Sequence, residues 1–404
     1  MEAPADITWK GFSVAERDRR WDTVRKNAAQ AGFDCVLVPL CLDGQNFHLS
    51  LEQAHGTRSD CRYLTLLDHA AVVLPTDGSR PIVITDSEDG NDWIAEPRRV
   101  KATWGAAMAD ALIEAGMEHA RIGVTGLGRG KVTHGRAYAG VVNHSSYAEI
   151  QRRLPNARFE DDNDVVGYAR YVKSSEEIDC LRRGAAIAAA GIEEMVRVAK
   201  PGVEEAFLYS RVMRRMLELG SEYYPLAFYS GPLDAVRLPR FEDPPLGRRL
   251  QPMCRIHNEV DAVWGGLIAQ EQQGIVLGPI PEEWQRVADL QRDLFYAGLE
   301  RMKPGVVFSE FIDSINSFGQ KAGMKSLILM HGRGYGDDGP LLTPQDRGER
   351  VRDVVIQERN VFVWKPIAMS GDEKIQYSWG GCVLVTAQGG VQLVQRTPGI
   401  VSIS

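Results

Sequence analysis

A histidine in a glycine-rich segment is the first candidate for chemistry in this sequence. His331 lies in the run Met330–Gly334, which reads Met-His-Gly-Arg-Gly, and Asp337 and Asp338 follow it. A nearby carboxylate can orient an imidazole or raise its pKa, and an imidazole transfers protons near neutral pH. The pattern predicts His331 as a general acid or base, with Asp338 beside it as a further catalytic group. The alternative is a histidine that only hydrogen-bonds a backbone carbonyl.

A lysine in an apolar segment is the second candidate. Lys365 follows the apolar run Val361–Trp364 and precedes Pro366, so its strand is expected to be buried on both faces. A buried ammonium group needs an anion near it. We expect that anion to be either Glu259 or Asp261, or else the carboxylate of a substrate.

Acidic and amide side chains occupy a predicted hairpin in the middle of the chain. Glu259 and Asp261 lie on its first strand, and Gln270 and Glu271 lie on its second. Strand alternation places Glu259 and Asp261 on one face. One of them is predicted to be the second acid or base. The alternative is that these are solvated charges on the surface of the hairpin.

The elements that must carry these residues begin with an α/β domain. A helix is expected over residues 16–31, ended by Gly32, and another over residues 105–116. The expected strands are Cys35–Leu40, Ala70–Leu74, Pro81–Thr85 and Arg121–Val124. The polar run Glu160–Asp164 is expected to separate this domain, residues 1–165, from a second domain, residues 166–404.

The second domain contains an internal repeat. Ser174 and Glu177 fit a capping box that opens a helix to about Ala199. Lys200–Val203 and Lys303–Val306 both read Lys-Pro-Gly-Val, and each is expected to connect two helices. Two related halves about 103 residues apart are therefore expected.

Composition restricts the class of protein. The 404 residues carry a net charge of −7, with a pI near 5.7, so there is no basic field to attract nucleic acid. The longest apolar runs have the length of a strand rather than of a membrane helix. The N-terminus has no signal-peptide pattern, so a cytoplasmic protein is expected. The six cysteines form no Cys-x-x-Cys pair and are expected to be reduced and buried.

Several segments, in their order and spacing, resemble the pita-bread family of creatinase, prolidase, aminopeptidase P and methionine aminopeptidase. They are Cys61–Thr65, Tyr171–Ile178, Lys200–Gly202, Ser230–Pro232, Met330–Gly334 and Val383–Thr386. The resemblance covers nearly the whole chain. It implies an α/β (α+β) fold, in which a small N-terminal α/β domain precedes a pseudo-twofold catalytic domain.

The resemblance also identifies where metal ligands would stand. Metal-dependent members use two aspartates, a histidine and two glutamates to hold two divalent ions. The matching positions here are near Glu259, at Gln270, His331 and Lys365, and in the segment Ser378–Gly381. A lysine would repel a divalent cation. We therefore expect no dinuclear metal centre and no cofactor.

Creatinase is the member of this fold that works without metal, and it supplies the main functional hypothesis. Under that hypothesis the chain is an enzyme that cleaves a C–N bond, or eliminates across a C–X bond, in a small anionic substrate bearing a carboxylate. The family's other two histidines match Leu238, beside Arg237, and Asp338. Arg237 is therefore predicted to clamp the substrate anion. The predicted substrate-binding residues are Lys365, Arg237, Gln270, Trp379, Arg58 and Arg62.

Two other functions stay open at this stage. The chain could be a non-catalytic binding protein or scaffold that kept the fold, or a lyase with a single metal ion held by His331 and by Asp337 or Asp338. The resemblance further implies a homodimer in which the neighbour's N-terminal domain completes each pocket. Arg58 or Arg62 would then act from the neighbouring subunit, although Arg62 in a structural salt bridge is the plainer interpretation.

Overall fold

The computed structural model describes residues 11–40, 57–87, 90–133, 135, 140–162, 164–235, 247–343 and 348–404. These residues form two compact units. The N-terminal unit comprises Gly11–Val172 together with Tyr335–Leu341. The second unit comprises Lys173–Gly334 and Leu342–Ser404, and it is called the catalytic unit after the domain that the resemblance implies. Within the described ranges, no helix combines the length and the apolar character needed to cross a membrane.

A six-stranded mixed sheet forms the N-terminal unit, in the order β4-β3-β2-β1-β5-β6. Its strands are β1 Cys35–Val38, β2 Ala70–Pro75, β3 Ile82–Thr85, β4 Arg98–Arg99, β5 Arg121–Val124 and β6 Arg158–Asp161. Its helices are α1 Val14–Gln30, α2 Thr57–Thr65, α3 Trp104–Glu114, α4 His144–Arg153 and α5 Val165–Tyr171. The predicted helices and strands of this region are confirmed to within a few residues.

Local chemistry explains where these elements begin and end. The Ser13 side chain caps α1 by accepting from the Glu16 N–H, and Gly32 follows the helix with a φ of 77°. Strand β1 is buried along its whole length and pairs with β2 on one side and β5 on the other. A continuous apolar strand of this kind belongs at the centre of a sheet.

The acidic run at residues 160–164 was expected to separate the two domains, but it is not a polar linker. Residues to Asp161 belong to β6, and Asp162 and Asp164 are buried. The Asp164 carboxylate accepts from the Lys131 N–H at 2.5 Å and from the Thr133 hydroxyl at 3.0 Å. Helix α5 follows and packs on α1, and the N-terminal unit continues to Val172.

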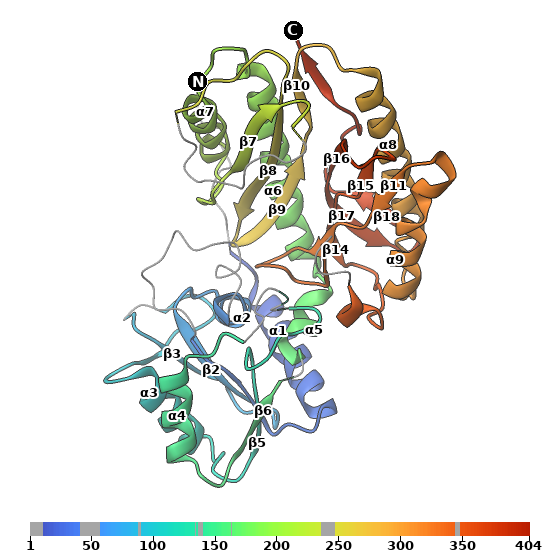
Figure 1. Ribbon diagram of the computed structural model, residues 1–404. Coiled ribbons are helices and arrows are strands. Elements are labelled where there is room, and N and C mark those ends of the chain that lie inside the picture. The colour runs from blue at the N-terminus through green and yellow to red at the C-terminus, as the bar shows by residue number, and fades with distance from the viewer. Residues whose placement is uncertain are drawn as a thin grey trace. The chain divides into compact units, whose positions relative to one another are not determined.

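The catalytic unit contains a ten-stranded sheet with the strand path β13-β12-β14-β17-β9-β8-β10-β19; β7 pairs with β8, and β18 with β17 (Figure 1). The strands of this sheet are β7 Ala227–Pro232, β8 Cys254–Trp264, β9 Leu267–Gln272, β10 Ile275–Leu277, β12 Met330–Gly332, β13 Leu341–Leu342, β14 Val361–Trp364, β17 Gly380–Thr386, β18 Gly389–Gln392 and β19 Val401–Ile403. A smaller sheet joins β11 Lys325–Leu327, β15 Ile367–Met369 and β16 Gln376–Ser378.

Two helix pairs cover this sheet and confirm the predicted repeat. They are α6 Ser175–Val198 with α7 Glu205–Glu218, and α8 Glu282–Arg301 with α9 Phe308–Asn316. The turns between the helices place Gly202 at a φ of 87° and Gly305 at 92°. Two positions after each glycine, the chain forms an isolated β-bridge: Glu204 pairs with Arg249, and Val307 pairs with Val355. The Ser174 capping box opens α6 as predicted.

Close packing of α8 holds the strand that leads to Lys365. A Cβ atom added at Gly298 would lie 2.3 Å from the ring of Trp364, so only glycine fits there. The Trp364 indole N–H also donates to the Phe295 carbonyl at 3.1 Å. These contacts lie on the helix-covered face of β14 and set the position at which the strand ends.

Candidate active site

One face of the large sheet carries the candidate site, and all of it belongs to the catalytic unit. Alternation along β8 places His257, Glu259 and Asp261 on one face. Asp261 lies directly opposite Gln270 of β9. Lys365 follows β14, and His331 lies on β12, which pairs with β14.

The ammonium group of Lys365 contacts one side chain from each of the two hairpin strands. It makes an ion pair with the Glu259 carboxylate and donates to Gln270 Oε1 at 2.8 Å. Lys365 is almost fully buried. A buried ammonium requires an anion near it, and here an internal carboxylate provides that anion. The anions considered from the sequence were Glu259, Asp261 and a substrate carboxylate, and the structure pairs Lys365 with Glu259.

This pairing sets the charge of Glu259. Burial by itself would raise the pKa of the carboxyl, but the Lys365 ammonium beside it prevails and lowers the pKa to about 2. His257 and His331 add smaller effects in the same direction, so both imidazoles lie within electrostatic range of Glu259. Glu259 is therefore ionised at neutral pH.

A second buried ion pair lies next to the first. Arg333 donates to Asp261 at 2.6 Å, and the Gln270 amide nitrogen lies 3.0 and 3.1 Å from the two Asp261 oxygens. Burial raises the pKa of Asp261, and the Arg333 guanidinium opposes that rise. Sequence reasoning missed Arg333. Its position two residues after His331 was the available signal, because alternate residues of an extended segment share a face.

His331 itself is buried, with 3% of its surface exposed. Its Nδ1 lies 3.1 Å from the carbonyl oxygen of Gly332. A carbonyl can only accept, so Nδ1 carries the proton in this arrangement. The backbone hydrogen bond considered from the sequence is therefore present, and it fixes the tautomer of the ring.

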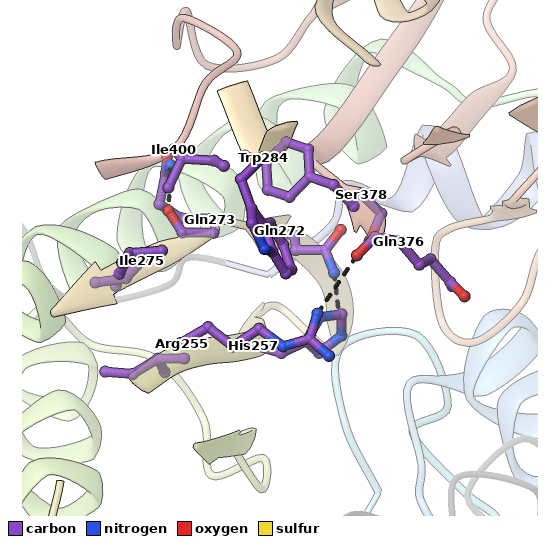
Figure 2. A pocket seen from close by; sticks show the side chains of 13 residues that line it. Arg255, His257, Gln272, Gln273, Ile275, Trp284, Gln376, Ser378 and Ile400 are labelled. Carbon is purple, nitrogen blue, oxygen red and sulfur yellow. Dashed lines mark hydrogen bonds between the residues drawn. The ribbon is translucent and has the colours of Figure 1, made fainter. Parts of the chain in front are cut away.

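His257 and Gln272 were not predicted as site residues, and they line a pocket of about 260 Å³ (Figure 2). The other lining residues include Arg255, Gln273, Trp284 and Tyr377. Gln272 Nε2 lies 3.3 Å from His257 Nε2. Burial lowers the pKa of His257 to about 4, so its ring is neutral at physiological pH. The signal in the sequence was its place two residues before Glu259.

Trp379 was predicted to contact substrate, and the structure places it in the core instead. None of its surface is exposed, and its ring packs edge-on against Phe295. Its indole N–H donates to Gln273 Oε1 at 3.0 Å. Because Gln273 lines the pocket, Trp379 supports the pocket wall from behind.

Asp338 was predicted to act beside His331, and that role stays a prediction. Asp338 belongs to the N-terminal unit, where its carboxylate pairs with Arg170 and accepts from the Tyr335 and Gly336 N–H groups. Arg170 also pairs with Asp60 at 2.5 Å. A carboxylate bound on all these sides anchors the segment Tyr335–Leu341 in the N-terminal unit.

The remaining predicted arginines lie outside the catalytic unit or outside the described residues. Arg62 lies 3.4 Å from Asp68 within the N-terminal unit, which matches the plainer salt-bridge interpretation. Arg58 belongs to α2, and its side chain is outside the described part of the structure. Arg237 and residues 41–56 are also outside it.

Comparison with known proteins agrees with this architecture. The family model of metallopeptidase family M24 matches residues 179–393. Ectoine hydrolase of Halomonas elongata is 29% identical over 168 residues, which cover 40% of this chain and 42% of that protein. Creatinase of a Bacillus species is 27% identical over 197 residues, which cover 48% of this chain and 43% of that protein.

An uncharacterized hydrolase/peptidase of Sinorhizobium fredii is 26% identical over 191 residues, covering 46% of this chain and 48% of that protein. The chain thus spans about half the length of the curated relatives it matches. A solved Xaa-Pro dipeptidase from Bacillus anthracis superposes with a TM-score of 0.73 at 16% identity, covering 96% of this chain and 100% of the other. That superposition shows the pita-bread fold expected from the sequence.

The family's name implies a metal, and the residues present do not fit one. Among the described residues, no three His, Cys, Asp or Glu side chains are grouped so that they could hold a metal ion. Lys365 supplies a cation between the hairpin positions Glu259 and Gln270. At Gly380, in the segment matched to the last ligand, an added Cβ would lie 1.8 Å from the Trp364 carbonyl oxygen. No side chain fits there.

Proposed function

The chain belongs to metallopeptidase family M24, and we propose that it is a metal-independent hydrolase acting on a small substrate that bears a carboxylate. The bond cleaved is C–N, with elimination across a C–X bond as the other reaction the site would permit. The observation that carries the proposal is the Lys365 ammonium between Glu259 and Gln270.

Electrostatics supports the absence of metal chemistry at this position. Two unit charges 4 Å apart repel by about 4 kcal/mol at an effective dielectric constant of 20, and a divalent ion doubles that figure. The Lys365 charge already satisfies Glu259, so a metal ion would have to displace a buried ion pair. Asp261, the nearest other carboxylate of β8, is paired with Arg333.

The relatives support the choice of substrate class. Ectoine hydrolase and creatinase are named for activities on small compounds rather than on peptides. The pocket of about 260 Å³ lined by His257 and Gln272 suits a ligand of that size, and the proposed catalytic residue Glu259 lies two positions after His257 on β8 rather than in the pocket lining.

In the proposed reaction His331 moves the proton. Its imidazole takes a proton from water as the water oxygen bonds to the substrate carbon, and it then returns the proton to the leaving nitrogen as the C–N bond breaks. The ionised Glu259 stabilises the imidazolium formed between these steps. Asp261, whose pKa is raised by burial, is the second proton-transfer group, and Arg237 would bind the substrate carboxylate.

The experiment combines a metal analysis with an activity screen. Protein purified without added metal is assayed against small amides, amidines, carbamoyl compounds and β-substituted acids that carry a carboxylate. We expect less than 0.1 equivalent of bound metal and a rate that chelator does not change. Two equivalents of bound metal with loss of activity in chelator would overturn the metal-independent mechanism.

A further inference from the structure

We propose that Arg255 binds the substrate carboxylate, in the pocket that His257 and Gln272 line. This inference rests on the proposed function, because it names a residue of that site that would recognise the carboxylate. Arg255 was not predicted as a site residue, and it adds a second arginine to Arg237. It lies on β8 and lines the pocket of about 260 Å³.

Strand alternation connects Arg255 to the candidate site. Side chains two positions apart in a strand point to the same face, so Arg255, His257 and Glu259 share a face of β8. Arg255 and His257 line the pocket, and Glu259 follows two positions later. A carboxylate bound by Arg255 would thus lie on the face of the sheet that carries the proposed catalytic side chains.

Three contacts hold the guanidinium group of Arg255. Its Nη2 donates to the Ala235 carbonyl oxygen at 2.8 Å, and its central carbon lies 4.9 Å from the centre of the Trp284 ring. Its Nη1 donates to the Gln376 carbonyl oxygen at 3.5 Å, and a dashed line in Figure 2 marks this contact. Carbonyl oxygens and an aromatic ring carry no net charge, so these contacts orient the guanidinium without neutralising it.

A ligand in the pocket can reach this guanidinium. Arg255 is half-buried, and its contact with Gln376 is exposed to solvent. The Trp284 ring under the guanidinium and the Gln376 carbonyl beside it both belong to lining residues. Burial lowers the pKa of His257, and the charge of Arg255 adds to this effect, so the guanidinium also lies within electrostatic range of that lining ring. The charged end of Arg255, and not only its aliphatic stem, therefore faces the pocket.

A carboxylate suits this group better than a neutral polar group does. The planar guanidinium presents N–H donors whose spacing matches the two oxygens of a carboxylate. Hydrogen bonds between charged partners are about twice as strong as those between neutral ones. Replacement of the ligand carboxylate by a neutral amide should therefore weaken binding by about 10-fold or more.

Three acids and their primary amides test the proposal: N-acetylglycine, N-acetyl-β-alanine and 4-acetamidobutanoate, each with its amide. Dissociation constants are measured by calorimetry on the full chain. At least one acid is expected to bind about 10-fold more tightly than its amide. Arg255→Met should bring these two constants within about 2-fold of each other, and Arg255→Lys, which keeps only the charge, should retain part of the preference. Lys374→Met removes an exposed cation two residues before Gln376, and as the matched control it should keep the preference.

The titration of His257 gives a second measurement on the same samples. A carboxylate at Arg255 places a negative charge near the imidazole, so the acid should raise the pKa of His257 and the amide should not. NMR follows the titration, and His257→Asn protein identifies the signal. The rise should be absent from Arg255→Met protein and present in Lys374→Met protein.

Several outcomes would overturn the role of Arg255. They are equal binding of acids and amides by the unmodified protein, a preference that survives Arg255→Met, and no saturable binding of any acid at 10 mM. If Arg255→Met protein does not fold, Arg255→Lys decides. An unchanged preference together with an unchanged rise in the pKa of His257 would then overturn the role.

The proposed function is judged separately, by the metal analysis and the chelator assay. Turnover without metal, with a carboxylate preference that survives Arg255→Met, would overturn this inference and leave the proposed function standing. Conversely, a metal requirement would overturn the proposed function, and the contribution of Arg255 to carboxylate binding would still be measurable by calorimetry.

Discussion

The Lys365 ammonium and the Glu259 carboxylate form an ion pair that joins the residue after β14 to β8, across 106 positions of sequence. Gln270 completes the set by accepting from the same ammonium at 2.8 Å. The family is named for metallopeptidases, but in this chain a lysine side chain, and not a metal ion, provides the positive charge at this point of the sheet.

Lys365→Met should destabilise the protein strongly. It leaves the partly buried Glu259 carboxylate without its cation, and removal of one partner from a largely buried pair costs up to about 3 kcal/mol. Urea unfolding measures the change. The double variant Lys365→Met/Glu259→Gln should recover much of that loss, because it removes both charges. Equal unfolding midpoints for Lys365→Met and the unmodified protein would show that the pair does not contribute.

Stability should fall as the pH drops from about 6.5 to about 4, through His257. Burial lowers its pKa to about 4 in the folded protein, whereas an unfolded histidine titrates near 6.5. Between pH 6.5 and 4 this histidine is protonated in the unfolded chain but not in the folded protein, so protonation favours unfolding. Once the pH is below 4, the free energy of unfolding is lower by on the order of 2 to 3 kcal/mol. His257→Asn should remove this part of the pH dependence of unfolding. The same substitution at the exposed His119 should leave it in place.

His331→Ala should lose about 100-fold or more in kcat while the fold is retained, because general acid–base catalysis contributes about that much. Steady-state kinetics on the substrate found in the screen, with circular dichroism on the same sample, make the measurement. Unchanged kcat would exclude His331 as the proton-transfer group. Unchanged ligand binding with no turnover in either protein would favour a non-catalytic binding protein.

Asp338→Asn should reduce stability and leave the pH profile of kcat unchanged. Arg170 would retain its ion pair with Asp60 but lose the one with Asp338, and weakening of this buried network is expected to cost about 3 kcal/mol. Arg170→Met should destabilise by a similar amount, and the two changes should be non-additive, since they break the same pair. If Asp338→Asn shifted an apparent pKa in the pH dependence of kcat, Asp338 would take part in proton transfer after all.

Assembly remains a proposal with its own test. We propose a homodimer in which the neighbour's N-terminal unit completes the pocket, with Arg58 or Arg62 as the contributing residue. Sedimentation at micromolar concentration should give a species near twice 44.8 kDa. Mixing Arg58→Ala with His331→Ala protein should restore part of the activity if subunits exchange. A monomer, or no recovery despite exchange, would contradict the shared pocket.

Local sequence signals determined much of this architecture. Ser174 and Glu177 produce a capping box from their spacing alone, and the two Lys-Pro-Gly-Val turns mark the repeated helix pairs. The alternation of His257, Glu259 and Asp261 places three functional side chains on one face, although only two of them were recognised. Such features depend on neighbours a few residues away, which is why a sequence can predict them.

Long-range pairing was decided by tertiary structure. Lys365 meets Glu259 because the sheet order brings β14, β17, β9 and β8 together, and no local pattern determines that order. Asp338 illustrates the reverse case. It is close to His331 in sequence, but Arg170 and two backbone N–H groups hold it in the N-terminal unit, since a buried carboxylate lies where its charge is satisfied.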